Sequence, residues 1–353
     1  MKSQQDNYPS RNERRSYSAV YLGILLLMAT CAGCAAPSIN VMKLEPGRSA
    51  EAAAFKKIAV LQFDGKGGNL FSSQLEGMLG GIKVNEKQFF EIVNRSAIAK
   101  VTEELKLAQS GLVDSSSAAK LGKLIGAKGI YIGSISSDVN DNEYTEGRSR
   151  CIQYSSDGKR CVDYEKWMVP CTKRTASFSA TPKLVDVGTA RVIFSKNYAE
   201  KSESSRCSDS SRALASGSEL VADLESAVIG KIRKDVAPFY MQIKVQLVSK
   251  NKDIASEEAK QQLKNGMAFA QSKRFDRACE IWREAQHLAP NSIAFLHNLA
   301  VCAETSGKLE YAHALIMKAD KQLLKPDQVV SASLQRIEKS IKSKEKLARQ
   351  QAD

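Results

Sequence analysis

Cysteine is the residue whose number and spacing suggest chemistry most directly in this chain. Of eight cysteines, four lie in one polar stretch of the sequence: Cys151, Cys161, Cys171 and Cys207. Zinc sites usually contain close pairs such as Cys-x2-Cys, but nine residues separate Cys151 from Cys161, and nine separate Cys161 from Cys171. An even number of cysteines in an exported chain favours two disulfides instead, and three pairings of the four are open.

The C-terminal third holds two further cysteines and all three histidines. Cys279 and Cys302 fall on predicted helices and are interpreted as small buried apolar side chains. None of His287, His297 and His313 has a Cys, Asp or Glu at a helical spacing typical of a metal site. We therefore expect no metal site here.

Motifs for catalysis or nucleotide binding are equally weak. The stretch 65–68, Gly-Lys-Gly-Gly, follows a predicted strand where a phosphate loop would lie, but it lacks G-x4-G-K-[ST]. The sequence contains no Gly-x-Ser-x-Gly nucleophile elbow. The sequence thus predicts no enzyme, no catalytic residue and no cofactor.

The N-terminus has the pattern of an export signal. Arg14 and Arg15 precede the apolar run 21–29, which is shorter than the ~20 residues of a spanning helix. The run ends in Cys-Ala-Gly-Cys-Ala, and the small residues before Cys34 resemble a bacterial lipobox, although Cys31 stands where leucine is usual. This resemblance implies a signal peptide over 1–33 and lipidation of Cys34. Lipidation of Cys31 and a plain anchor helix are the alternatives.

A lipidated Cys34 would anchor the protein to a membrane rather than span it. Ala35, a neutral residue after that cysteine, is typical of outer-membrane lipoproteins in Gram-negative cells. The predicted location is the outer membrane, facing the periplasm. Residues 34–54 are polar and rich in small side chains, and we interpret them as a tether.

Residues 55–136 alternate between predicted strands and helices, which indicates an α/β layer. The excursion 138–172 is long and polar, with an expected turn near 155–158 and bracing by disulfides. A hairpin, a helix and a last strand then complete the domain near residue 250. The expected strands are 58–61, 89–93, 129–135, 174–187, 191–198 and 239–248, and the expected helices are 70–82, 96–108, 118–125 and 214–236.

Four segments of this domain resemble one known family. They are IAVLQF from Ile58, FEIVNR ending at Arg95, Glu103–Leu105, and LGKLIGAKGIYIGSI from Leu121 to Ile135. These segments are similar to the CsgG superfamily of curli-secretion proteins, which includes holdfast anchors and LpoB-type activators of peptidoglycan synthases. The resemblance covers about residues 55–248. It implies a CsgG-like mixed sheet with flanking helices and a non-enzymatic role in envelope or surface-structure assembly and transport.

Residues 255–353 form a second predicted domain, made only of helices. Two copies of a 34-residue pattern, 259–292 and 293–326, resemble the tetratricopeptide repeat, a stacked helix-turn-helix unit. A charged segment after them is expected to form a capping helix. Such repeats bind protein segments in a groove, and the groove candidates are Lys264, Asn265, His297 and Asn298, with mere solvent exposure as the alternative. The expected partners are envelope proteins.

Charge and hairpin patterning narrow the choice of function. The net charge of +13 comes from scattered residues without an arginine-aromatic module, so no nucleic acid is expected as a partner. Channel-forming relatives insert long hairpins into the membrane, but the excursion 138–172 is highly charged, with no apolar row evident. Protein docking is therefore preferred. An oligomeric secretion pore and an LpoB-like activator stay open as alternatives, as does a homo-oligomer.

Overall fold

The computed structural model describes residues 37–93, 114–250 and 252–351. The predicted signal peptide, Cys34 and the expected helix 96–108 lie outside these residues. The chain forms two compact units: one comprises Met42–Met241 with Ser340–Asp353, and the other comprises Met1–Val41 with Gln242–Lys339. Among the described residues, no helix is both long enough and apolar enough to cross a membrane.

A mixed sheet forms the centre of the first unit, as expected. The order of the strands is β5 (Glu91–Ile92), β2 (Lys57–Val60), β6 (Gly129–Tyr154), β7 (Cys161–Asp186) and β8 (Val192–Ser195), and β9 (Tyr198–Cys207) also pairs with β7. Strand β2 runs parallel to β5 and β6, whereas β7 is antiparallel to its three partners. Both faces of β2 are buried, which explains why its apolar run is continuous rather than alternating.

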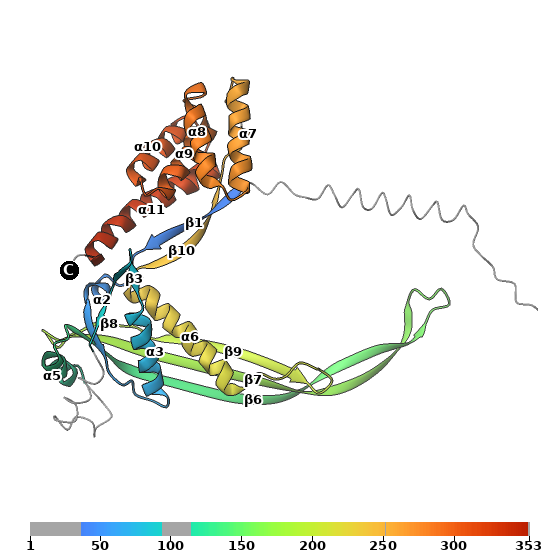
Figure 1. Ribbon diagram of the computed structural model, residues 1–353. Coiled ribbons are helices and arrows are strands. Elements are labelled where there is room, and N and C mark those ends of the chain that lie inside the picture. The colour runs from blue at the N-terminus through green and yellow to red at the C-terminus, as the bar shows by residue number, and fades with distance from the viewer. Residues whose placement is uncertain (1–36, 94–113, 251, 352–353) are drawn as a thin grey trace, which may run out of the picture. The chain divides into compact units, whose positions relative to one another are not determined.

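Helices cover both faces of this sheet, because residues that alternate along a strand point to opposite sides. Helices α3 (Gly68–Gly80) and α6 (Gly217–Val236) lie over one face, where they pack on Ile58, Tyr131 and Phe178. Helix α5 (Ser115–Ile125) packs on the other face against Ala59, Ile130 and Val185. Figure 1 shows α3 and α6 side by side along the sheet and α5 apart from them. The α/β layer predicted from the sequence is confirmed.

Strands β6 and β7 form a hairpin of 26 residues on each side, far longer than the strands predicted from their apolar parts (Figure 1). The register runs from Gly129 opposite Asp186 to Tyr154 opposite Cys161. The polar excursion is therefore a continuation of both strands, held along its length by backbone hydrogen bonds between β6 and β7. The turn lies near 155–158, as predicted: the Ser155 amide donates to the Arg160 carbonyl at 2.7 Å.

Residues 34–54 are not a tether as interpreted from the sequence, because most of those that the structure describes form a strand or a helix. Ser38–Glu45 form strand β1, which pairs with β10 (Phe239–Gln246), and Ala50–Ala54 form helix α2. Ile39 and Val41 alternate into buried positions, a pattern too short to stand out in the sequence. The small residues Ala52 and Ala53 are fully buried, so they serve packing rather than flexibility.

A small hairpin, β3 (Lys83–Val84) and β4 (Lys87–Gln88), follows α3.

The second unit contains the two expected helix pairs. They are α7 (Glu257–Gln271) with α8 (Phe275–Ala285), and α9 (Ile293–Thr305) with α10 (Leu309–Lys321); a short 3-10 helix, η2 (Gln286–Leu288), follows α8, and α11 (Gln328–Gln351) follows α10. Gly266 of α7 lies against Trp282 of α8, where an added Cβ would fall 2.1 Å from the indole nitrogen. The small residue therefore allows the close helix crossing that the repeat pattern predicts.

The interpretation of Cys279 and Cys302 as unbonded apolar side chains is wrong. They form a disulfide between α8 and α9, with an S–S distance of 2.02 Å and a Cα–Cα distance of 5.7 Å. Both residues are buried, as expected, but the two helices bring them together. This disulfide joins the first helix pair to the second.

Candidate functional site

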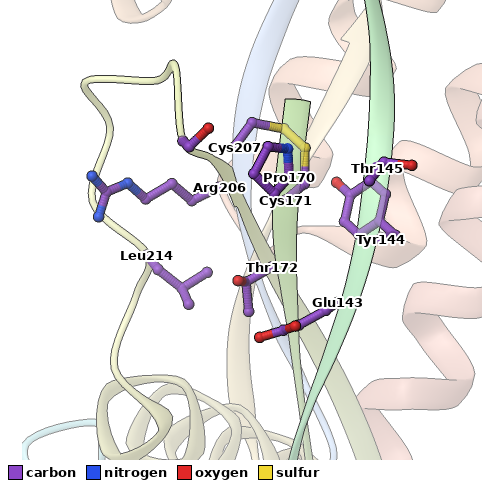
Figure 2. A pocket seen from close by; sticks show the side chains of 10 residues that line it. Glu143, Tyr144, Thr145, Pro170, Cys171, Thr172, Arg206, Cys207 and Leu214 are labelled. Atoms are coloured by element: carbon purple, nitrogen blue, oxygen red, sulfur yellow. A yellow bond between two sulfur atoms is a disulfide. The ribbon is translucent and has the colours of Figure 1, made fainter. Parts of the chain in front are cut away.

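A hollow of about 620 Å³ lies where β6, β7 and β9 run side by side (Figure 2). The loop 208–216, which follows β9, forms its other wall. Figure 2 shows Leu214 of this loop facing Thr172 and Glu143 on the strands. The lining combines opposite charges, hydroxyl groups and a few apolar side chains: Glu143, Tyr144, Thr145, Pro170, Cys171, Thr172, Arg206, Cys207, Ser208 and Leu214.

Three of these residues form one row across the sheet. Glu143 is directly opposite Thr172 in the β6–β7 register, and Thr172 is directly opposite Arg206 in the β7–β9 register. Directly opposite residues share a face of the sheet, so the acid and the base lie on the same face with a neutral hydroxyl between them. Two strand spacings put their Cα atoms about 10 Å apart.

In the neighbouring row of the same strands, an acid and a base are directly opposite and form an ion pair. There Asp141 and Arg174 are directly opposite each other, and Arg174 donates to both carboxylate oxygens at 2.8 and 2.6 Å. These hydrogen bonds lower the pKa of the Asp141 carboxyl, although burial opposes the shift. Within the part of the chain that the structure describes, Glu143 and Arg206 form no such ion pair. Both residues are exposed and line the hollow.

The loop over the hollow is held at both ends. At its start, the Ser208 amide donates to the Pro170 carbonyl at 2.9 Å, and Arg148 donates to Asp209 at 2.8 Å. At its end, Arg174 donates to the Ala215 carbonyl at 2.9 Å. These contacts fix the loop before any ligand arrives, so the hollow is preformed, which lowers the entropic cost of binding.

The four predicted cysteines form two disulfides. Cys171 and Cys207, directly opposite on β7 and β9, are joined beside the hollow, and Cys151 and Cys161 are joined near the hairpin turn. The Glu146 carboxylate lies close to the first pair, in an arrangement that could resemble a metal site. Because both sulfurs are bonded to each other, they do not offer the thiolates that a metal requires.

The hairpin beyond the hollow carries an apolar row that the sequence analysis missed. Val162, Tyr164 and Met168 are 57%, 52% and 62% exposed, and their spacing puts them on one face of β7. The acidic residues Asp163 and Glu165 alternate onto the other face. Lys166 lies on the same face between Tyr164 and Met168, so the absence of a continuous apolar row stays a prediction.

Two of the four predicted groove residues are buried in the helical unit. His297 and Asn298 are each 0% exposed. The Asn298 amide accepts from the Val248 N–H and donates to the Val248 carbonyl, both at 2.9 Å, while His297 Nε2 lies 2.8 Å from the Ser333 hydroxyl. Their prediction as partner-groove residues is wrong. They instead connect α9 to the segment after β10 and to α11.

The other two groove candidates lie nearer the surface. Lys264 is exposed and lines a hollow of about 350 Å³ together with Lys260, Glu257 and Met267. Asn265 is half-buried, and its amide oxygen accepts from Gln261 of the same helix at 2.8 Å. Lys264 therefore stays a candidate for partner contact, whereas Asn265 is engaged within α7.

Comparison with known proteins places this architecture in a family. Residues 49–267 match the family described as "Curli production assembly/transport component CsgG". The match covers more than half of the chain, and the protein belongs to the CsgG family. No curated protein matches the chain.

Two solved structures are similar over part of the chain. The LpoB C-terminal domain from Salmonella enterica shares 16% identity over 42% of this chain and 84% of its own, with a TM-score of 0.25. The PelC dodecamer from Paraburkholderia phytofirmans shares 14% identity over 56% of this chain and 98% of its own, with a TM-score of 0.23.

Proposed function

We propose that this protein is a non-enzymatic, lipid-anchored docking protein of the outer membrane. It faces the periplasm and binds envelope proteins during assembly or transport of the cell envelope or a surface structure. The observation that carries the proposal is the CsgG family match over residues 49–267. The helix pairs that follow it resemble tetratricopeptide repeats, a class that binds protein segments. Three disulfides agree with an oxidising compartment such as the periplasm.

The anchor is tested by fractionation and mass measurement. We expect the protein in the outer-membrane fraction, with the mass of a lipidated chain that begins at Cys34. Cys34→Ser should be soluble in the periplasm and unlipidated, whereas Cys31→Ser should behave like the unchanged protein. An outer-membrane location that survives Cys34→Ser, with no lipid added, would contradict the proposed anchor.

A secretion pore is the second candidate, and the apolar row of the β6–β7 hairpin favours it. The row is interrupted by Lys166, and Asp163 and Glu165 lie on the opposite face. Electron microscopy and mass measurement of the detergent-extracted protein distinguish the two functions. A ring of subunits that crosses the bilayer supports the pore, while a monomer or dimer released from the membrane by Cys34→Ser supports the docking protein.

A further inference from the structure

We propose that the hollow between the sheet and the loop 208–216 binds an extended peptide segment with one acidic and one basic side chain two residues apart. The acidic side chain pairs with Arg206 and the basic one with Glu143. This inference rests on the proposed docking function, because it assigns a partner chemistry to the α/β unit. The site is separate from the helical repeat.

The charge distribution of the sheet carries the inference. Neighbouring charges on these strands are paired within the chain: Asp141 with Arg174, Glu203 with Lys173, and Glu165 with Arg150. Glu143 and Arg206 are the opposite charges that line the hollow, and Thr172 keeps them apart. A charge pair that is split across a preformed hollow presents one anion site and one cation site to a ligand.

Spacing favours an extended peptide as the occupant. Side chains at positions i and i+2 of a strand point the same way, about 6.5–7 Å apart. The Cα atoms of Glu143 and Arg206 are about 10 Å apart, and their long side chains can close the remaining distance to such a pair. Thr172 offers a hydroxyl between them for a backbone group of the peptide, and Leu214 and Pro170 supply apolar walls.

The walls of the hollow are rigid. Its floor is formed by β6, β7 and β9, and the Cys171–Cys207 disulfide joins β7 to β9 (Figure 2). Hydrogen bonds from Arg174 and Arg148 fix its loop. A rigid site spends little of the binding free energy on ordering itself. Because the two charges are opposite, the peptide binds in one direction, with its acidic side chain at Arg206 and its basic side chain at Glu143.

The test uses detergent-extracted full-length protein and a fluorescent peptide, acetyl-Ala-Asp-Ala-Lys-Ala-amide, followed by fluorescence anisotropy at low salt. We expect saturable binding. A neutral peptide with Asn and Gln at the charged positions should bind at least about fivefold more weakly, as should the charged peptide with Arg206→Ala or Glu143→Gln. Arg191→Ala, an exposed arginine outside the hollow, is the matched control and should leave binding unchanged.

Charge reversal makes the test sharper. Arg206→Glu alone and Glu143→Arg alone should abolish binding, since each places two like charges in the hollow. The double variant should bind again, because the peptide can then lie in the opposite direction. Disulfide mapping and circular dichroism check that each variant is folded. The comparison of the charged and neutral peptides uses the unchanged protein, so it does not depend on the folding of any variant.

Several results would overturn the inference. Equal binding of the charged and neutral peptides, or no saturable binding of either, excludes an ion-pair site. Self-association that disappears with Arg206→Ala would show that a second copy of the chain occupies the hollow instead. None of these results depends on the membrane location of Cys34→Ser, so this inference and the proposed anchored function fail independently.

Discussion

The side chain of Asn298 hydrogen-bonds both backbone groups of Val248, with two distances of 2.9 Å. Val248 follows the last strand, β10, and has no regular strand partner for these groups. A buried amide with a donor and an acceptor satisfies both at once. Asn298 thus secures the chain just before the helix pairs begin.

Replacing this amide should destabilise the helical unit. Asn298→Leu removes both hydrogen bonds and leaves two buried backbone groups unsatisfied, at a cost of about 1–3 kcal/mol each. We expect a clearly lower midpoint in urea unfolding followed by circular dichroism. Asn265→Ala, at a half-buried position of α7, is the control and should change the free energy of unfolding by less than about 0.5 kcal/mol. An equal effect of both substitutions would contradict this role for Asn298.

His297 should make the helical unit sensitive to acid. Burial lowers the pKa of His297 from 6.5 to about 4, although its hydrogen bond to Asn298 opposes this shift. Since Asn298 Oδ1 accepts, Nδ1 of the neutral ring donates and Nε2 accepts from Ser333. The unfolded chain binds a proton at higher pH than the folded one, so stability is full above about 6.5 and falls toward 4.

Unfolding measured between pH 7 and pH 4 checks this sensitivity. The unchanged protein should lose up to about 3 kcal/mol from His297 alone over this range. His297→Gln should be less stable at pH 7 but should lose less on acidification, and His313→Gln should follow the unchanged protein. Parallel pH profiles for the unchanged protein and His297→Gln would show that another group is responsible.

Asp235 should contribute strongly to the stability of the α/β unit. This buried carboxylate accepts from Tyr198 at 2.6 Å, from Lys196 at 2.7 Å and from Arg48 at 3.2 Å. Burial raises its pKa, but the hydrogen bonds from Lys196 and Tyr198 outweigh burial and the net pKa is lowered. Stability from this group is therefore present above pH 3.8 and is lost as the pH falls below that value.

Asp235→Ala leaves a buried hydroxyl and two cations without their acceptor, and we expect a loss of about 2–3 kcal/mol. Thermal unfolding at pH 7 measures it. Asp223→Ala, at an exposed position of the same helix, should have little effect. A similar loss for both would indicate that helix propensity, and not the network, is the cause.

The Cys279–Cys302 disulfide should stabilise the helix pairs. Its sequence separation of 23 residues corresponds to an entropic stabilisation of about 3 kcal/mol. Peptide mapping under non-reducing conditions should recover this pair, and Cys279→Ser with Cys302→Ser should unfold at lower urea concentration. The matched double variant Cys151→Ser with Cys161→Ser, at an exposed hairpin turn, should lower the midpoint far less. Recovery of Cys279 as a free thiol would contradict the pairing.

Several elements could be predicted from the sequence because their signals are local. The apolar run after Lys57 predicts β2, and Gly126 marks the end of α5, where it adopts φ of 69° as a left-handed cap. Gly266 and Trp282 predict the close crossing of α7 and α8. In each case residues within one strand, one helix or one 34-residue repeat carry the information.

Other features could not be predicted, because they depend on residues far apart in the sequence. The partners of His297 and Asn298 are Ser333 and Val248, so a position on the first helix of a repeat does not reveal burial. The hollow requires the registers of both β6–β7 and β7–β9, which place Glu143, Thr172 and Arg206 in one row. No spacing within a single segment indicates that row.

The length of the β6–β7 hairpin has a consequence for the timing of folding. Over residues 161–170, β7 pairs only with β6, and this two-stranded ribbon is about 30 Å long. Isolated two-stranded ribbons are marginally stable in water, but the Cys151–Cys161 disulfide joins the two strands of this ribbon at its tip. At its base, the Cys171–Cys207 disulfide fixes β7 to β9. We expect the ribbon to stay frayed while the thiols are reduced. The ribbon should therefore be paired over its full length only after the cysteines are oxidised.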